Sequence, residues 1–290
     1  MGESGRVPTD QPQDFGKGEW CQPMVMRQSL KIVLWLLISI AINHPSFADG
    51  IAPEITQLKP PLPTSILFVG NSYLYYNDSL HNHFKRMVDE KYPGFNGSKN
   101  VKSSTIGGSR LKHHNLDHLL KPKAISSINK FELVILQGGS GEGLSRKDRN
   151  AFAKVAKNQI RKIRANGSQP ALYMIHAYVE PHINFDPDLI RVIEEMYLTA
   201  GNKNQALVIP VGLAFENAYK RRPDIKLHHL DGTHPALLGT YLAACTVFAS
   251  VFGVSPVGLG YDYNGLVNSH DKLFLQEIAE STVRRFYHSS

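Results

Sequence analysis

Five short predicted strands, most of them apolar, alternate with amphipathic segments along the chain, and this alternation limits the possible fold more than any other feature. The predicted strands span residues 65–69, 101–106, 132–136, 171–176 and 206–211. The run 132–136 is almost entirely apolar, as expected of a central strand that is buried on both faces. Strands that alternate with helices form a parallel sheet covered by helices on both sides. The sequence therefore predicts a three-layer α/β/α sandwich around a mostly parallel, five-stranded sheet.

The N-terminal residues predict a segment that is removed before folding. Arg27 and Lys31 precede the apolar run 32–42, which is too short to span a bilayer comfortably, and Ser46-Phe47-Ala48 resembles a signal-peptidase site. We therefore expect residues 1–48 to be an upstream extension plus a secretory signal peptide. Residues 49–63 would be a Pro-rich lead and 64–290 the α/β domain. The mature protein would be periplasmic or secreted, the alternative being an uncleaved N-terminal anchor.

Composition excludes some classes of function. The 290-residue chain is 42% hydrophobic with a net charge of +7, but its basic residues are scattered and form no nucleic-acid-binding module. Cys21 falls in the predicted signal region, so Cys245 would be the lone cysteine of the mature chain, and we expect it to be buried and unreactive. None of the 13 histidines has the spacing of a helical zinc pair with a companion carboxylate. The sequence thus predicts no nucleic-acid partner and no metal.

The first candidate site residue is Ser72, which follows the predicted strand 65–69 in the sequence Gly70-Asn71-Ser72. Open α/β sheets bind their ligands at the carboxyl ends of the strands, so this serine lies where a nucleophile would be needed. On its own, the tripeptide is equally consistent with a polar turn, because all three residue types favour turns. Ser72 needs an adjacent base to act as a nucleophile.

That base is available in Asp231-Gly232-Thr233-His234, which precedes a long apolar helix. A histidine can accept the serine proton, and an aspartate three residues earlier can orient its ring. We expect Pro235 to occupy the first helical position, where its missing N–H costs nothing. Asp231 and His234 taken alone are also consistent with an ordinary turn at a helix entry.

Two further polar loops follow predicted strands. Gly107-Gly108-Ser109 comes after 101–106, and Gln137-Gly138-Gly139-Ser140 comes after 132–136. Glycines allow close backbone approach, so one of these N–H groups could point into the crevice. The loop after strand 171–176 carries Tyr178 and His182. In a parallel sheet all these loops converge on one edge, which favours a common site for acyl transfer.

Together, these motifs resemble the SGNH/GDSL hydrolase superfamily over most of residues 64–253. The resemblance implies a flavodoxin-like fold and a serine esterase with no cofactor. Ser72, Asp231 and His234 correspond to the family's catalytic triad. The N–H of Ser72 and a glycine N–H, of Gly108 or Gly107, correspond to oxyanion-hole donors, and we take Gly108.

The third block departs from the family pattern, because an asparagine is usual where this chain has Gln137. Its Leu136-Gln137-Gly138-Gly139-Ser140 looks more like the version in sugar O-acetylesterases. The resemblance thus implies that Gln137, with Ser140 as the alternative, supplies the third donor and that the substrate is an O-acetylated carbohydrate. Possible substrate contacts, from the neighbouring loops, are Asn71, Ser140, Tyr178 and His182.

Other functions remain open at this stage. A lipid-ester hydrolase, a thioester hydrolase or an O-acetyltransferase would use the same triad. A non-catalytic carbohydrate-binding module on the same fold would leave Ser72 and His234 beyond hydrogen-bonding distance. An envelope protein that binds a partner would need a large exposed apolar patch. We expect an ester substrate and no stable membrane insertion after signal cleavage.

Overall fold

The computed structural model describes residues 51–288, so the expected signal segment lies outside the described residues. Five parallel strands form the sheet, in the order β2-β1-β3-β4-β5. They are β1 (Ile66–Gly70), β2 (Val101–Thr105), β3 (Leu133–Gln137), β4 (Gln169–Tyr173) and β5 (Leu207–Ile209). In the register, Ile66 lies between Val101 and Leu133. The predicted α/β fold with a five-stranded sheet is confirmed.

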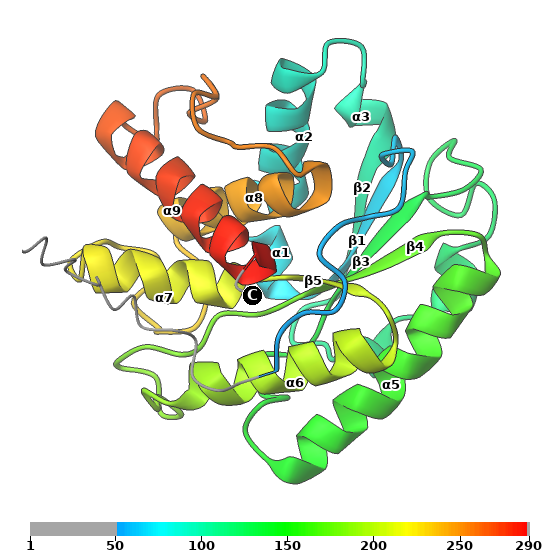
Figure 1. The fold of residues 1–290 in the computed structure, drawn as a ribbon, viewed down its shortest axis with the longest axis horizontal. Coiled ribbons are helices and arrows are strands. Elements are labelled where there is room, and N and C mark those ends of the chain that lie inside the picture. Colours follow the sequence, from blue (N-terminus) through cyan, green and yellow to red (C-terminus); the bar gives the residue numbers. More distant parts are fainter. Residues whose placement is uncertain (1–50, 289–290) are drawn as a thin grey trace, which may run out of the picture. The chain divides into compact units, whose positions relative to one another are not determined.

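Helices cover both faces of this sheet (Figure 1). The long ones are α2 (Leu80–Lys91), α5 (Arg146–Ala165), α6 (Leu189–Lys203), α7 (Val211–Arg221), α8 (Leu237–Phe252) and α9 (Ser269–His288). The short ones are α1 (Ser72–Tyr75), α3 (Gly97–Asn100), α4 (Leu116–Leu119) and the 3₁₀ turn η1 (Leu111–His113). α5 and α6 pack on one face, and α2, α8 and α9 form the layer on the other.

The strand order explains why the helices separate into two layers. From β1 the chain crosses to β2 on one side, whereas from β3 it crosses to β4 and β5 on the other. Since such crossovers are right-handed, the reversal of direction places α2 and the α5–α6 pair on opposite faces. The reversal falls between β1 and β3, the position at which open α/β sheets bind ligands.

The core lies on both faces of the sheet, under the α5–α6 layer and under the α2–α8–α9 layer. All five residues of β1 are buried, and Phe68 packs edge-to-face on Phe84 of α2 with ring centroids 5.4 Å apart. Helix α8 is apolar all round and is buried along nearly its whole length, as expected of a helix enclosed by other elements. Its Cys245 is fully buried and free, and burial raises the pKa of the thiol. This side chain is a packing residue.

Helix starts were predicted less well than strands. The sequence Ser145-Arg146-Lys147-Asp148 resembles a capping box, and Ser145 does cap α5, accepting a hydrogen bond from the Asp148 N–H. From the sequence, Asn77 or Asp78 is expected to cap the helix that carries Leu80 and Phe84, but Ser79 occupies the N-cap position of α2. The Asn77 amide instead donates to the Pro235 carbonyl at 2.7 Å. Asn77 therefore ties the segment after Ser72 to the segment after His234.

Two predicted helix starts at proline are also wrong. Asp186-Pro187 predicts a helix start with an N-cap and a proline at the first position. Instead, α6 begins at Leu189, and the Asp186 side chain accepts from the Asp188 N–H in the turn just before it. α8 begins at Leu237, two residues after Pro235. Pro235 instead forms an antiparallel bridge with His228. Within residues 51–288, no helix combines the length and apolarity needed to cross a membrane.

Candidate active site

Ser72, His234 and Asp231 form a continuous chain of hydrogen bonds. Ser72 is the first residue of α1, just past the carboxyl end of β1. Its hydroxyl lies 2.9 Å from His234 Nε2, and His234 Nδ1 lies 2.6 Å from Asp231 Oδ2. Residues separated by about 160 positions in the sequence thus meet at one edge of the sheet.

The Asp231–His234 turn is held by the aspartate itself. Asp231 Oδ1 accepts hydrogen bonds from the N–H groups of Thr233 and His234, both at 3.0 Å. Gly232 has a φ of +68°, and a Cβ there would lie 2.2 Å from the Val179 carbonyl oxygen. Only glycine fits this close approach without strain.

Hydrogen bonding keeps the Asp231 carboxylate ionised. Partial burial alone would raise its pKa, but the hydrogen bonds from the His234 ring and from the two backbone N–H groups lower the pKa of Asp231 to about 2. An ionised carboxylate can only accept, so His234 carries its proton on Nδ1. The free Nε2 lone pair then faces the Ser72 hydroxyl. In this arrangement, His234 can accept the proton of Ser72.

Buried side chains pack against the Asp231–His234 turn and hold it in place. The sequence did not indicate them. The Tyr73 and Thr233 hydroxyls are hydrogen-bonded at 2.7 Å. His176 Nε2 donates to the Thr233 carbonyl at 2.9 Å, and its ring stacks on Tyr73 with centroids 4.2 Å apart. Burial lowers the pKa of His176 well below its usual value, so the ring stays neutral. His176 and Tyr73 therefore position the turn that carries Asp231.

His228 supports the same turn from its N-terminal side. Its Nδ1 accepts from the Tyr219 hydroxyl at 2.7 Å and its Nε2 donates to the Ala177 carbonyl at 3.2 Å. Burial lowers the pKa of His228 to about 4. His176 and His228 also meet edge-to-face, with ring centroids 4.8 Å apart. The neutral imidazoles act as structural hydrogen-bonding groups.

Tyr76 is a further residue of the site that sequence reasoning missed. Its ring stacks on the His234 imidazole, with centroids 4.2 Å apart and an interplanar angle of 10°. The run Tyr73-Leu74-Tyr75-Tyr76 follows Ser72 directly, and this cluster of aromatic residues was the available signal. The stacking restricts the orientation of the ring that faces Ser72.

Gln137 and Asn71 link the third loop to the nucleophile turn. Gln137 is buried at the end of β3, and its Oε1 accepts the Asn71 N–H at 2.9 Å. Its Nε2 donates to the Gly138 carbonyl. The Asn71 amide donates to the Ser109 carbonyl and accepts from the Tyr73 N–H, both at 3.0 Å. Asn71 is 3% exposed, so its side chain bonds the protein itself.

Glu142 supports the loop after Gln137. Its Oε2 accepts the Gly139 N–H at 2.7 Å, and Tyr197 accepts the Gly138 N–H at 3.1 Å. The carboxyl is only 3% exposed. Burial raises the pKa of Glu142 to about 7, although the Gly139 N–H opposes the shift. The loop therefore rests on a titratable group that sequence reasoning did not single out.

The other predicted residues lie on loops around the triad. Gly108 is exposed with a φ of +64°, and within residues 51–288 its N–H donates to no backbone carbonyl. Tyr178 is buried and stacks on His182 with centroids 3.8 Å apart. The Ser140 hydroxyl lies beside Tyr178.

Backbone contacts bring the Tyr178–His182 loop to the triad turn. The Val179 N–H donates to the Gly232 carbonyl at 2.9 Å. The roles of all these loop residues remain predictions. Among residues 51–288, no group of three or more histidine, cysteine or acidic side chains could hold a metal ion.

Comparison with known proteins identifies the fold. No family model matches the sequence, and no curated protein matches it either. A DUF4886 family protein from Bacteroides uniformis matches in structure with a TM-score of 0.58 and 17% identity, over 76% of this chain and 94% of that one. A putative SGNH hydrolase from Slackia heliotrinireducens matches with a TM-score of 0.52 and 21% identity, over 64% and 97%. The chain has the SGNH hydrolase fold.

An acetyl xylan esterase shares this SGNH fold, with a TM-score of 0.50 and 17% identity over 64% of this chain and 99% of that one. The resemblance inferred from the Ser72 and Asp231–His234 motifs is thus confirmed at the level of the fold. In the SGNH arrangement found here, those two motifs meet where β1 ends and α8 begins.

Proposed function

We propose that the protein is a serine esterase that removes O-acyl groups, and specifically O-acetyl groups, from a carbohydrate. One observation carries this proposal: the hydrogen-bonded chain from Ser72 through His234 to Asp231. The proton-accepting nitrogen faces the hydroxyl, and the partner carboxylate is ionised. This is the arrangement that makes a serine hydroxyl nucleophilic.

Acylation begins when His234 Nε2 takes the Ser72 proton as the serine oxygen attacks the ester carbonyl. Asp231 stabilises the imidazolium that forms. His234 then donates the proton to the leaving alcohol oxygen, and the C–O bond breaks to give an acyl-enzyme. Water attacks the acyl-enzyme by the same route, and His234 returns the proton to Ser72.

Three donors would hold the oxyanion of the tetrahedral intermediate. We assign the N–H groups of Ser72 and Gly108 and the side-chain amide of Gln137. Because the Asn71 N–H requires an acceptor, Gln137 Oε1 faces Asn71 and Nε2 is the donor end. One of its hydrogens bonds the Gly138 carbonyl, which leaves the second for substrate. A single oxyanion donor contributes about 3–4 kcal/mol in comparable sites.

Fewer observations support the substrate class than support the reaction type. The Gln137 loop resembles that of sugar O-acetylesterases, and we propose that the mature chain is exported to where such polymers occur. Ser140, Tyr178 and His182 would contact the substrate. A carbohydrate-binding module without activity is disfavoured, because it has no need of a serine and a histidine within hydrogen-bonding distance.

Hydrolysis of p-nitrophenyl acetate and of acetylated xylan and chitin oligomers tests the proposal. We expect Ser72→Ala to lower the rate by roughly three or more powers of ten. Ser98→Ala, in the short helix α3, is the matched control and should leave the rate unchanged. The ranking of the substrates tests the carbohydrate assignment separately.

Equal rates in the wild type and Ser72→Ala, or no hydrolysis by either, would contradict the esterase proposal. Selective cleavage of long-chain esters would retain the triad but replace the sugar with a lipid. Faster acyl transfer to an added sugar than to water would indicate a transferase.

A further inference from the structure

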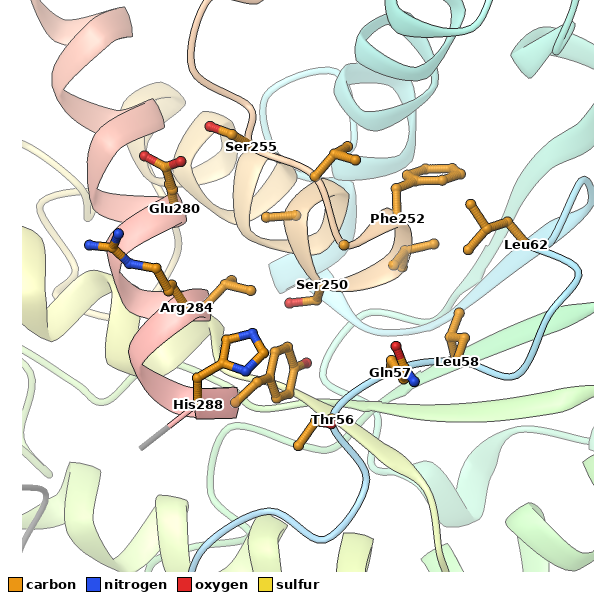
Figure 2. Close-up of a pocket in the computed structure, with 16 residues that line it drawn as sticks. Thr56, Gln57, Leu58, Leu62, Ser250, Phe252, Ser255, Glu280, Arg284 and His288 are labelled. Carbon is orange, nitrogen blue, oxygen red and sulfur yellow. The ribbon is translucent and has the colours of Figure 1, made fainter. Parts of the chain in front are cut away.

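The pocket shown in Figure 2 lies between the end of α8, the last turns of α9 and the lead before β1. Two of its polar side chains are used within the protein. Arg284 points toward Glu280 on the same helix, and the Ser250 hydroxyl lies beside the Tyr287 hydroxyl. This pocket therefore gives no indication of a ligand.

Ser109 and His114 form a second serine–histidine pair, close to the nucleophile turn. Both residues are only 4% exposed, and Ser109 Oγ lies 2.9 Å from His114 Nε2. Within residues 51–288, His114 Nδ1 has no hydrogen-bond partner, so no carboxylate orients this ring. Because the pair is enclosed and lacks an orienting acid, it is not a second nucleophile.

The direction of this hydrogen bond follows from the surroundings of His114. Burial and the neighbouring His113 lower the pKa of His114, so the ring is neutral and carries one proton. A proton on Nδ1 would be a buried donor without an acceptor, which is costly. The Gly70 carbonyl, which can only accept, also hydrogen-bonds the ring. His114 therefore carries its proton on Nε2 and directs it toward Ser109 and Gly70.

Ser109 grips the peptide group that precedes the nucleophile. Its Oγ donates to the Gly70 carbonyl at 3.4 Å, and its own carbonyl accepts the Asn71 side-chain amide at 3.0 Å. The Asn71 N–H donates to Gln137 Oε1 at 2.9 Å. The Gly70–Asn71 peptide group is thus held at its carbonyl by the loop after β2 and at its N–H by the loop after β3. Ser72 follows this peptide group directly.

Ser109 also closes the turn that carries Gly108. The Ser109 N–H donates to the Ile106 carbonyl at 3.2 Å, which makes Gly107 and Gly108 the two central residues of a tight turn. Gly108 takes a φ of +64° there. A shift of Ser109 would therefore move the Gly108 N–H relative to Ser72.

We propose that Ser109 and His114 are positioning residues for the esterase reaction, which hold the Gly108 N–H and the Gly70–Asn71 peptide group in the geometry of the oxyanion hole. This inference rests on the proposed esterase function. Both side chains act through backbone groups rather than on the ester itself. A misplacement of about 1 Å can lower a rate roughly 100-fold, so the pair should affect catalysis more than substrate binding.

Steady-state hydrolysis of p-nitrophenyl acetate by Ser109→Ala tests the proposal. We expect kcat and kcat/KM to fall together by roughly 10- to 100-fold, because an oxyanion hole acts in the transition state. Each rate is divided by the concentration of active sites. That concentration is measured by intact mass after complete labelling of Ser72 with a fluorophosphonate, so misfolded molecules do not lower the result.

Two substitutions of His114 separate its hydrogen bond from its volume. His114→Gln keeps an N–H donor at a similar distance along the side chain, so kcat should stay within about threefold of the wild type. His114→Leu fills similar space without a donor and should lower kcat roughly tenfold or more. His118→Leu, at an exposed position on α4, is the control and should leave kcat unchanged.

The outcomes distinguish this inference from the esterase proposal. An unchanged kcat for each labelled site in Ser109→Ala would overturn the inference and leave the esterase proposal intact. Equal losses in His114→Gln and His114→Leu would also overturn it, since they would indicate a purely steric role. If Ser109→Ala yields no labelled sites, the two His114 variants decide. No hydrolysis by the wild type would overturn the esterase proposal, and with it the role assigned to the pair.

Discussion

Glu142 gives a quantitative prediction about how stability depends on pH. Its carboxyl is 3% exposed and accepts the Gly139 N–H. Burial raises the pKa of Glu142 from 4.5 to about 7. Between pH 4.5 and about 7, Glu142 is therefore protonated in the folded protein but ionised in the unfolded chain.

The sign and size of the effect follow from that difference. Because the folded state binds more protons, the free energy of unfolding falls as pH rises through this window. The contribution of Glu142 is fully present below pH 4.5 and is lost as the pH passes 7. Each unit of pKa shift corresponds to about 1.4 kcal/mol, so the free energy of unfolding falls by about 3 kcal/mol across this window.

Urea denaturation of the wild type and Glu142→Gln, at pH values from 4 to 8, measures this loss. The glutamine cannot ionise, and its carbonyl can still accept the Gly139 N–H. We expect the stability of the variant relative to the wild type to rise by about 3 kcal/mol across the series. The control Glu195→Gln, at an exposed position on α6, should show no such rise. A stability difference that stays flat for Glu142→Gln would refute the reasoning.

Two further substitutions test the support of the site and of the fold. Tyr73→Phe leaves the Thr233 hydroxyl without its 2.7 Å partner. We therefore expect a loss of about 1–2 kcal/mol in the free energy of unfolding and a lower rate of ester hydrolysis. An unchanged free energy and an unchanged rate would contradict this expectation. Gly212→Ala places a Cβ 2.2 Å from the Ile175 carbonyl oxygen, so thermal denaturation should show a loss of about 1–3 kcal/mol. Gly260→Ala, whose Cβ meets no atom closer than 3.4 Å, is the control, and an equal loss there would refute the steric argument.

Four of the strands were predictable because each is a largely apolar run bounded by polar residues, whereas β2 is mostly polar and only half-buried. The run that contains β3 was identified to within one residue at each end, since a strand buried on both faces has an unambiguous pattern. Its carboxyl end then located Gln137. The same rule, that parallel strands end at one edge, brought Ser72 into proximity with the loops that follow the other strands.

The buried supports of the site could not be predicted in this way. His176 and His228 each hydrogen-bond a backbone carbonyl from another part of the chain. The direction of a carbonyl depends on the fold and has no local signal. A histidine near the end of a strand is equally compatible with the surface, with a core or with a metal. Their role becomes visible only when Thr233 and Ala177 are placed against them.

The departure at Gln137 has a physical explanation in the structure. A glutamine at the end of β3 has the reach to let its Oε1 accept the Asn71 N–H, next to the nucleophile. That bond joins the third loop to the Ser72 turn, and it also determines which way the amide nitrogen faces. A donor whose orientation is set before the substrate arrives needs no reorganisation during the reaction. The hydrogen bond that holds the nucleophile turn is therefore the same one that would orient the proposed oxyanion donor.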